Sequence, residues 1–424
     1  MKREHSDGHK EFNPETLALG LGYDPALSQQ AVKPPIFLTS TFQFASAAEG
    51  KRFFELAYGL REPDEGESRG LIYSRLNNPN LQIFEERMAA WDRTEMGATF
   101  ATGMAAISTT VLALVKPGDV VLSSSPVYGG THYLFHHILP SFGIDVRFVP
   151  AGDDVAQGMR SAAQELGPER VRVLFLETPA NPNMEHSDIA AVSELGRELS
   201  RPRDQGDDVV TVVDNTLLGP VFQRPASLGA DVVLYSATKF LGGHSDLVAG
   251  VATGPEAIMR TIRDLRTILG TVTTPFNGWL LLRSLETVSI RMRRQAKNAR
   301  RLAQLLSEHP RVTRVLFPTL LEPGSPQREL FERQCTGSGS LLAFELQGGE
   351  AAAFEVLDRF EVFRLAVSLG GTESLVEHPM SMTHADVPPP ELEALGVTAG
   401  MIRMSVGIEH LSDLQRDLKF ALRK

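Results

Sequence analysis

One lysine of this chain stands where its side chain could act as a nucleophile. Lys239 follows an apolar run, 231–235, and lies between the hydroxyl residues Ser236 and Thr238, with two glycines shortly after it and no charged neighbour. Burial disfavours the ammonium form of a lysine and lowers its pKa, which lets the amine form a Schiff base. A lysine that simply ends a core strand is the structural alternative, so the other motifs must decide.

A second group of residues could hold a phosphate. Thr102-Gly103-Met104 precedes a predicted helix. A glycine there lets backbone N–H groups approach an anion at the positive end of the helix dipole. The hydroxyls of Ser236 and Thr238 add donors, and Arg75 could add a bidentate clamp. An ordinary helix N-cap also explains the Thr-Gly-Met run.

Three other side chains could complete a site for a heteroaromatic cofactor. Asp214 ends a valine-rich run, 209–213, where a carboxylate is costly unless it is paired. It could be the counter-ion of a protonated ring nitrogen, which makes such a ring an electron sink. Tyr128 could stack on the ring, and Arg403, inside an apolar segment, could clamp a substrate carboxylate. The alternatives are a turn cap, core packing and a solvent-facing strand residue.

The elements that would position these residues alternate along the middle of the chain. Short apolar runs, each followed by small or polar residues and a helix or loop, occur at 120–124, 146–149, 171–176, 209–213 and 231–235. This alternation predicts an α/β fold with a mostly parallel sheet covered by helices. Ligands of such sheets bind beyond the carboxyl ends of the strands, where Asn181, Asp214 and Lys239 lie.

The flanking regions have a different organisation. Residues 1–77 are loop-rich and have too few periodic apolar positions to close a core, which predicts an arm packed on a neighbouring subunit. Residues 78–288 form the predicted large domain. A long basic helix (290–309) then leads to apolar runs at 312–317, 341–346 and 402–406, which predict a smaller α+β domain over 289–424.

Composition narrows the class of protein further. The 424 residues are 42% hydrophobic, enough for a large core, and the formal net charge of -10 argues against nucleic-acid binding. A single cysteine, Cys335, excludes an internal disulfide and indicates a reducing compartment. No apolar leader or membrane span is evident, so we expect a soluble, cytoplasmic protein with no membrane partner. We assign no metal site, and no Gly-x-Gly-x-x-Gly follows an early strand, which disfavours a dinucleotide-binding oxidoreductase.

Eight motifs in order give the chain a family resemblance from about Pro34 to the C-terminus. They are Tyr73-Ser-Arg75, Thr102-Gly-Met104, Tyr128-Gly-Gly-Thr131, Glu177–Asn183, Val213–Thr216, Ser236–Lys239, Ser368–Gly370 and Arg403–Gly407. Together they resemble the pyridoxal-phosphate-dependent trans-sulfuration family of cysteine and methionine metabolism. That family includes methionine γ-lyase, cystathionine γ-lyase and cystathionine γ-synthase.

The resemblance implies a fold-type-I enzyme that uses pyridoxal 5'-phosphate (PLP), with active sites shared across a dimer and two dimers forming a tetramer. It implies that Lys239 forms the Schiff base with the cofactor and acts as a base, that Asp214 pairs with the ring nitrogen, and that Tyr128 stacks on the ring and serves as acid or base. It further implies cofactor contacts by Asn181 to the ring hydroxyl, by Gly103, Met104, Ser236 and Thr238 to the phosphate, and by Tyr73 and Arg75 from the partner subunit. Ser368, Arg403 and Tyr73 would position the substrate.

The reaction that the resemblance favours is γ-elimination. The substrate would be a sulfur amino acid of the methionine, cystathionine or homocysteine type, and the products 2-oxobutanoate, ammonia and a thiol. The alternative is γ-replacement on an activated homoserine, as in cystathionine γ-synthase or O-acylhomoserine sulfhydrylase. A regulatory module that binds the cofactor without turnover is disfavoured by the full catalytic set.

Four features bear on which family member the chain resembles. Val367 is small and apolar, as in methionine γ-lyases. Gly130 stands where those enzymes carry a cysteine, and Arg266-Thr267 where they carry Lys-Asp, which points away from efficient methionine cleavage. The polar segment 61–70 is longer than is usual in the family. We hypothesise that this segment lines the mouth of the partner's active site.

Overall fold

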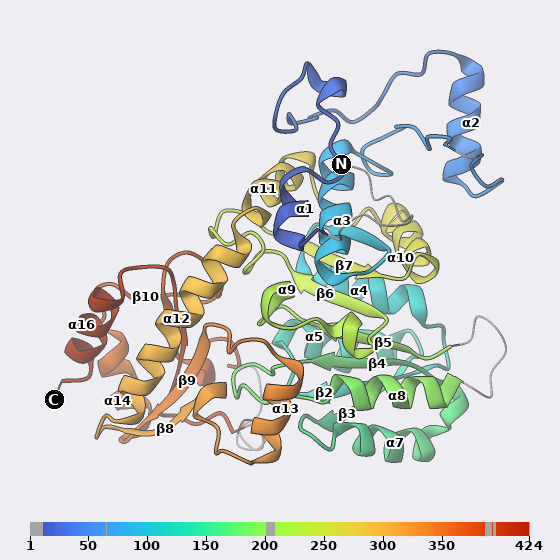
Figure 1. Ribbon diagram of the computed structural model, residues 1–424. Helices are drawn as coiled ribbons and strands as arrows, with labels where there is room; N and C mark the ends of the chain where they lie inside the picture. The colour runs from blue at the N-terminus through green and yellow to red at the C-terminus, as the bar shows by residue number, and fades with distance from the viewer. Residues whose placement is uncertain (1–11, 65, 201–207, 386–391, 393–395, 424) are drawn as a thin grey trace.

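The computed structural model describes residues 12–64, 66–200, 208–385, 392 and 396–423. Two β-sheets organise these residues (Figure 1). The strands of the larger sheet are β1 (Met96–Phe100), β2 (Val120–Ser125), β3 (Asp145–Pro150), β4 (Val171–Glu177), β5 (Val210–Asp214), β6 (Val232–Ser236) and β7 (Gly250–Gly254). Their spatial order is β1-β7-β6-β5-β4-β2-β3. β2 to β6 run parallel to one another, and β7 is antiparallel to both of its neighbours, which confirms the predicted mostly parallel sheet.

The strands are apolar because helices cover both faces of this sheet. Every residue of β4 is buried, as expected for a parallel strand with a helix layer on each side. Side chains alternate between the faces, so Leu174 and Leu176 join one cluster and Phe175 joins another. The helices on the Phe175 side are α4 (Gly103–Leu114) and α10 (Glu256–Leu269), and those on the opposite side are α3 (Pro79–Asp92), α7 (Val155–Leu166), α8 (Ile189–Ser200) and α11 (Pro275–Leu285).

Shorter helices connect these elements. They are α5 (Gly129–Tyr133), η2 (Leu134–Ile138), α6 (Leu139–Ser141), η3 (Pro168–Arg170), α9 (Gly219–Phe222) and η4 (Pro225–Leu228). Strand β1 is parallel to β6, because both pair antiparallel with β7. The carboxyl ends of β1, β2, β4, β5 and β6 therefore meet at one edge of the sheet.

The second sheet is built from the C-terminal part of the chain. Its order is β10-β11-β12-β9-β8, with β8 (Val312–Leu316), β9 (Leu341–Leu346), β10 (Arg364–Leu365), β11 (Leu375–Glu377) and β12 (Met401–Ser405). The helices of this region are α12 (Val288–Ser307), η5 (Pro318–Leu320), α13 (Pro326–Gln334), α14 (Gly349–Leu357), η6 (Pro379–Ser381) and α16 (Leu411–Ala421), and α12, α14 and α16 share one core with the sheet. The smaller α+β unit matches the predicted fold class. The predicted boundary at 288/289 falls at the start of α12 and stays a prediction.

The N-terminal segment stands off from this body. It contains α1 (Pro14–Gly20), η1 (Pro25–Ser28) and α2 (Ala47–Ala57), and Figure 1 shows α2 extended away from both sheets. Leu27 and Val32 are each 83% exposed, and Leu38 and Leu60 are each 73% exposed. Such large apolar side chains in water are the expected property of an arm that packs on another subunit. Residues 1–11 and 65 of the predicted arm lie outside the described residues, as do 386–391, 393–395 and 424 of the small domain.

The segment 61–70 folds back onto α2. Arg61 Nη2 lies 2.6 Å from Glu67 Oε1, and Arg52 Nη1 lies 3.2 Å from the same oxygen. Gly70 lies against the Phe53 ring, where a Cβ would come within 2.2 Å of a ring carbon. The described part of this segment is therefore tied to its own arm.

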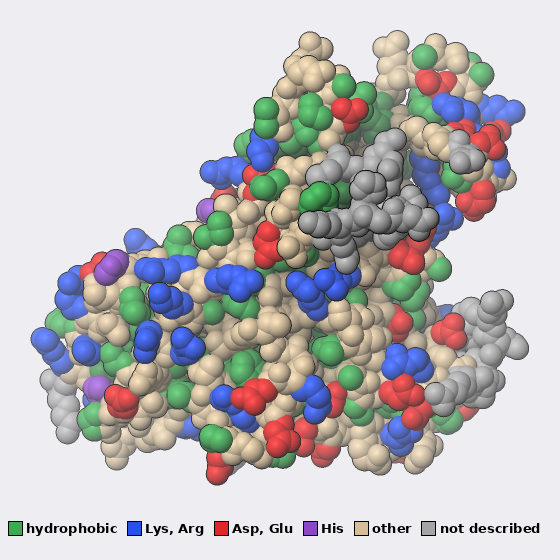
Figure 2. All heavy atoms as spheres, in the orientation of Figure 1, with side chains coloured by type: hydrophobic (Ala, Val, Ile, Leu, Met, Phe, Trp, Pro, Cys, Tyr) green, Lys and Arg blue, Asp and Glu red, His purple; other side chains and the backbone are tan. Residues whose placement is uncertain are grey.

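None of the helices in the described ranges combines the length and the apolar character needed to cross a membrane. Figure 2 shows charged side chains of both signs distributed over the face in view, with Lys and Arg concentrated in the region of α12. That helix carries six basic residues, Arg291, Arg293, Arg294, Lys297, Arg300 and Arg301.

Candidate active site

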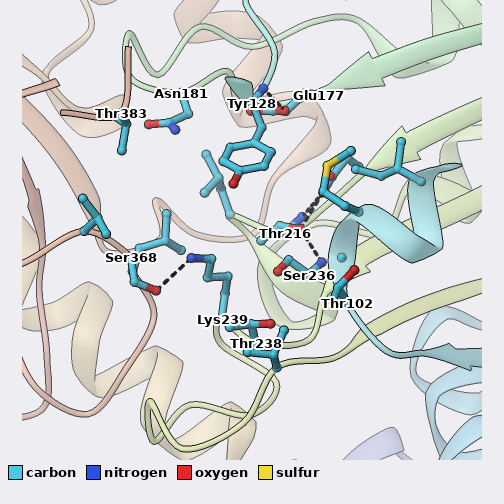
Figure 3. Close-up of a pocket in the computed structure, with 18 of the residues that line it drawn as sticks. Thr102, Tyr128, Glu177, Asn181, Thr216, Ser236, Thr238, Lys239, Ser368 and Thr383 are labelled. Carbon is cyan, nitrogen blue, oxygen red and sulfur yellow. Dashed lines mark hydrogen bonds between the residues drawn. The ribbon is translucent and has the colours of Figure 1, made fainter. Parts of the chain in front are cut away.

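A cavity of about 450 Å³ lies at the edge where the strands of the large sheet end, and part of its wall comes from the small sheet (Figure 3). The predicted site residues that line it are Gly103, Met104, Tyr128, Asn181, Asp214, Ser236, Thr238, Lys239, Ser368 and Arg403. Tyr73 and Arg75 do not line it. The cavity therefore gathers residues that are up to 300 positions apart in the chain.

Lys239 extends into the cavity from the turn that follows β6. Its Nζ donates a hydrogen bond of 2.8 Å to Ser368 Oγ (Figure 3). Burial, and then the positive charge of Arg403, lower the pKa of the Lys239 amine to about 8, while Glu377 acts in the opposite direction. The lysine is therefore an amine that loses its proton far more readily than a lysine in water.

Ser368 is held in an unusual backbone conformation opposite the lysine. Its φ angle is 109°, a region that residues with a side chain rarely adopt. Gly370, two residues later, packs against the backbone of Phe240, where a Cβ would lie 2.7 Å from the backbone nitrogen. This close approach brings the Ser368 hydroxyl to the amine of Lys239.

Asp214 and Glu177 form a pair of buried carboxylates at the ends of adjacent strands. They are register partners in the β4–β5 ladder. Burial raises the pKa of Asp214, and burial together with the negative charge of Asp214 raises the pKa of Glu177 to about 8. Glu177 accepts a hydrogen bond of 2.7 Å from the backbone N–H of Tyr128. Two enclosed acids of this kind favour a cation beside them.

Thr216 supports Asp214 directly. Its Oγ1 donates to Asp214 Oδ1 at 2.5 Å, and its backbone N–H donates to the same oxygen at 3.0 Å. Both bonds favour the charged carboxylate and oppose the effect of burial. The same Oγ1 accepts a hydrogen bond of 2.8 Å from the backbone N–H of Ser236, so one hydroxyl links the ends of β5 and β6.

The N-terminus of α4 offers backbone donors to the cavity. Thr102 caps the helix through a 2.8 Å bond from Ala105 N to its Oγ1. The N–H groups of Gly103 and Met104 have no acceptor in the part of the chain that the structure describes. A Cβ on Gly103 would lie 2.8 Å from Ser236 Cβ, so only glycine permits this approach. These donors and the helix dipole suit a phosphate.

The hydroxyl of Thr238 is engaged elsewhere. It donates to Ala249 O at 3.2 Å and accepts from Ala249 N at 3.1 Å. Thr238 lines the cavity as predicted, but its hydroxyl is committed to the backbone of the loop that precedes β7.

Tyr128 projects into the cavity opposite Lys239, with its hydroxyl turned towards the centre (Figure 3). The residue is 50% exposed, so its ring has room on one face. Gly130 makes that position possible: a Cβ there would lie 2.7 Å from Tyr128 Cε1 and 2.9 Å from Met104 Sδ. A flat aromatic ring could therefore stack against the tyrosine.

Arg403 brings a buried positive charge to the side of the cavity formed by the small sheet. Its Nη1 lies 2.9 Å from Glu377 Oε1 and donates to Asn181 Oδ1 at 3.2 Å. Its Nη2 donates to the Ser368 carbonyl at 2.9 Å. Since Asn181 uses its oxygen on Arg403, its amide N–H₂ is the group that could meet a cofactor oxygen.

Tyr73 and Arg75 lie on the arm. Arg75 donates to the Thr267 carbonyl at 2.7 Å, and its guanidinium carbon is 5.7 Å from the centre of the Tyr73 ring. Arg266, the residue before Thr267, is buried and pairs with Glu85 at 2.6 Å. The Arg266-Thr267 pair therefore contributes a core ion pair and a backbone acceptor for Arg75, and neither residue lines the cavity.

Several residues at or beside the site received no role from the sequence, and four of them are polar: Glu177, Thr216, Glu377 and Thr383. Glu177 ends an apolar strand just as Asp214 does, so the same argument could have found it. Thr216 follows Asp214 by two residues, a spacing typical of a turn in which a hydroxyl bonds a carboxylate. No comparable sequence signal marks Glu377 or Thr383. Glu377 reaches Arg403 because the two residues are register partners on β11 and β12.

These features fit a phosphorylated pyridine aldehyde. The free N–H groups at the start of α4 match a phosphate, the buried amine of Lys239 matches an aldehyde, and the paired acids Asp214 and Glu177 match a protonated ring nitrogen. The half-exposed ring of Tyr128 offers a stacking surface.

Comparisons with known proteins agree with this fit. Residues 15–423 match the family described as Cys/Met metabolism PLP-dependent enzyme. L-methionine gamma-lyase of Pseudomonas deceptionensis is 39% identical over 420 residues, covering 99% of each chain, and cystathionine beta-lyase of Coxiella burnetii is 36% identical over 98% of this chain and 100% of that protein. The crystal structure of cystathionine gamma synthase from Xanthomonas oryzae pv. oryzae, in complex with aminoacrylate and cysteine, has a TM-score of 0.86 at 33% identity, covering 97% of this chain and 98% of that one. A match of this length places the chain in the Cys/Met metabolism family of PLP-dependent enzymes, which confirms the predicted resemblance, cofactor and fold type.

Proposed function

We propose that this enzyme catalyses γ-elimination on a sulfur amino acid of the methionine, cystathionine or homocysteine type. With water, the reaction gives 2-oxobutanoate, ammonia and a thiol. The observation that carries the proposal is the Lys239 amine, which lies 2.8 Å from Ser368 Oγ with its pKa lowered to about 8, in a cavity that also contains Asp214 and Arg403. The L-methionine gamma-lyase among the relatives favours γ-elimination.

The geometry supports the following division of labour among the residues. PLP, when bound, supplies an aldehyde that condenses with amines and a ring that delocalises the electrons released at the substrate Cα. Asp214 would hold a proton at the ring nitrogen, with Thr216 keeping the Asp214 carboxylate charged. Gly103, Met104 and Ser236 would hold the phosphate. Asn181 would contact the ring hydroxyl through its amide nitrogen.

The substrate is bound and deprotonated by groups on opposite walls. Arg403 binds the α-carboxylate, which orients the Cα–H bond, and Ser368 keeps Lys239 within reach of it. Lys239 Nζ removes the Cα proton and then a proton from Cβ, because an amine with a pKa of about 8 is a competent base near neutral pH. The electron pair left at Cβ expels the sulfur from Cγ. Tyr128, whose hydroxyl is directed into the cavity, donates a proton to the leaving sulfur.

We propose that the site is completed by a second copy of the chain in a homo-oligomer, a dimer of dimers. Tyr73 and Arg75 of a neighbouring subunit would then reach the phosphate and the substrate. The apolar side chains exposed on the arm support this assembly. The segment 61–70, held on the arm by Glu67, would lie near the neighbouring cavity, and deleting it should alter substrate preference.

A second candidate is γ-replacement, in which a thiol takes the place of the leaving group. The close structural match to a cystathionine gamma synthase favours it. Gly130, which stands where methionine γ-lyases carry a cysteine, weighs only against efficient methionine cleavage. Both reactions share Lys239, Asp214 and Arg403. In replacement a thiol adds at Cγ, whereas in elimination Cγ gains a proton and water releases ammonia at Cα.

Product analysis separates the two functions. Purified enzyme is incubated with methionine, cystathionine, homocysteine or an acylated homoserine, each with and without a thiol, and 2-oxobutanoate, ammonia and thioethers are measured. Elimination predicts 2-oxobutanoate from a sulfur amino acid without added thiol. Thioether formed only from acylated homoserine and thiol would replace elimination with γ-replacement.

A further inference from the structure

Glu377 lies directly behind the arginine that faces the substrate. It is the last residue of β11 and the register partner of Arg403 on β12. Its side chain is buried and does not line the cavity. The 2.9 Å ion pair between Glu377 Oε1 and Arg403 Nη1 therefore sits one layer below the cavity wall.

The hydrogen-bond donors of Arg403 are unequally used. A guanidinium has five N–H donors. Nη1 faces Glu377 and Asn181, and Nη2 donates to the Ser368 carbonyl. Nε is buried and has no acceptor among the described residues. Within the described chain Nε thus keeps an unused donor, and the bond from Nη2 to the Ser368 carbonyl uses one of its two N–H groups.

Glu377 is imperfectly satisfied in the same arrangement. Its Oε1 accepts a 2.9 Å hydrogen bond from Thr383 Oγ1, whereas its Oε2 is buried without a partner in the described chain. Burial raises the pKa of Glu377 although the charge of Arg403 opposes this shift. A buried acid with one oxygen lacking a hydrogen bond costs folding free energy, even beside an arginine. Its presence is explained if the acid acts on the arginine itself.

We propose that Glu377 is a positioning residue that both orients Arg403 and partly neutralises it, so that the α-carboxylate of the substrate is held in the right place but not too tightly. This inference rests on the proposed role of Arg403 in substrate binding. Glu377 fixes Nη1 and with it the orientation of the guanidinium that lines the cavity. Its negative charge also repels a second carboxylate on the other side of the same guanidinium.

Two substitutions separate orientation from charge. Glu377→Gln keeps an oxygen that can accept from Arg403 and Thr383 but removes the charge. It should therefore tighten carboxylate binding by roughly tenfold, since a nearby like charge is lost. Glu377→Ala removes the oxygen as well, leaves Arg403 held only by Asn181 and the Ser368 carbonyl, and should weaken binding. A merely structural role predicts that both variants change binding in the same direction.

The binding experiment uses butanoate and the PLP-loaded enzyme. Butanoate has the carboxylate and carbon chain of the substrate but no amine, so it cannot react with the cofactor, and its dissociation constant is measured by calorimetry. Glu345→Gln is the matched control, because Glu345 lies in the same sheet and pairs with Arg314 at 3.7 Å. The control should bind butanoate as the wild type does.

Steady-state kinetics give the second readout. Glu377→Gln should lower KM for the best substrate by about the same factor as the dissociation constant, with kcat within about twofold, as expected for a change in uniform binding. Glu377→Ala should raise KM. If Glu377→Ala fails to fold, the isosteric Glu377→Gln variant alone decides.

The outcomes distinguish this inference from the proposed function. Unchanged or weaker butanoate binding by Glu377→Gln overturns the role of Glu377, even if the enzyme eliminates the γ-substituent as proposed. Tighter binding upholds it, even if the reaction proves to be γ-replacement. If butanoate does not bind the wild type and Arg403→Lys leaves KM unchanged, the role of Arg403 is wrong, and the inference falls with it.

Discussion

Removing the hydroxyl of Thr216 should disable the site without changing its shape. Thr216→Val is nearly isosteric, but Asp214 loses the 2.5 Å bond from Oγ1 and keeps the 3.0 Å bond from the backbone. A hydrogen bond to a charged group contributes about 1.5–3 kcal/mol. If that amount is lost from transition-state stabilisation, kcat/KM should fall about 10- to 150-fold, at about 1.4 kcal/mol per factor of ten.

The same substitution has a separate cost in stability. Ser236 N, which donates to Thr216 Oγ1 at 2.8 Å, would be left without an acceptor. An unsatisfied buried donor costs about 1–3 kcal/mol of unfolding free energy. Thr216→Ser retains the hydroxyl and is the control: it should restore most of the activity and the melting temperature.

The assay is steady-state kinetics on the best substrate, with cofactor content checked by absorbance and stability by thermal unfolding. A Thr216→Val enzyme that is fully loaded and within twofold of wild type would show that the charge on Asp214 does not depend on Thr216. A Thr216→Ser enzyme as poor as Thr216→Val would show that the hydroxyl alone does not sustain activity and that the packing of the methyl group is also required.

Three other substitutions probe the same cavity. Gly103→Ala places a Cβ 2.8 Å from Ser236 Cβ, and overpacking of this kind costs about 1–3 kcal/mol. The affinity of the apoenzyme for PLP, measured by titration, should therefore fall about 5- to 150-fold. Gly20→Ala is the control and should bind PLP normally, because no atom lies within 4 Å of its new Cβ. Gly130→Ala should lower kcat at an unchanged melting temperature, because the new Cβ would lie 2.7 Å from Tyr128 Cε1 and displace the Tyr128 ring. An unchanged kcat would argue against Tyr128 as an acid. The pKa of Glu177 is raised from 4.5 to about 8, so this residue keeps a proton in the folded apoenzyme that the unfolded chain releases. The unfolding free energy of the wild type should therefore fall relative to that of Glu177→Gln as pH rises from about 4.5 to 8, and the difference should stay constant above about pH 8. A difference that does not depend on pH in thermal unfolding would contradict this pKa.

The sequence predicts the part of the site that local patterns determine. Asp214 and Lys239 each follow an apolar run, and parallel strands end at one edge, so their proximity follows from the fold class. The pairing of Glu377 with Arg403 could not be predicted in this way, because it depends on the register of two short strands separated by residues 378–400. A one-residue shift would turn the carboxylate to the other face of the sheet.

Two other features depended on tertiary packing. The Thr238 hydroxyl turns to Ala249 because β7 returns antiparallel beside β6, and β7 was absent from the predicted strands. Arg266 is buried and paired with Glu85, and this pairing could not be inferred from the correspondence of Arg266-Thr267 to a Lys-Asp pair.

The order of the cavity residues along the chain has a consequence for how substrate preference can change. The groups that fit the cofactor lie between residues 102 and 239, whereas Val367, Ser368, Leu369, Met382, Thr383 and Arg403 form a wall encoded entirely in the last third of the sequence. A crossover within α12 between two related genes would therefore exchange this wall as a unit and leave the cofactor-binding part of the cavity intact. Chimeras made at that helix offer a direct route to new specificities on the same catalytic base.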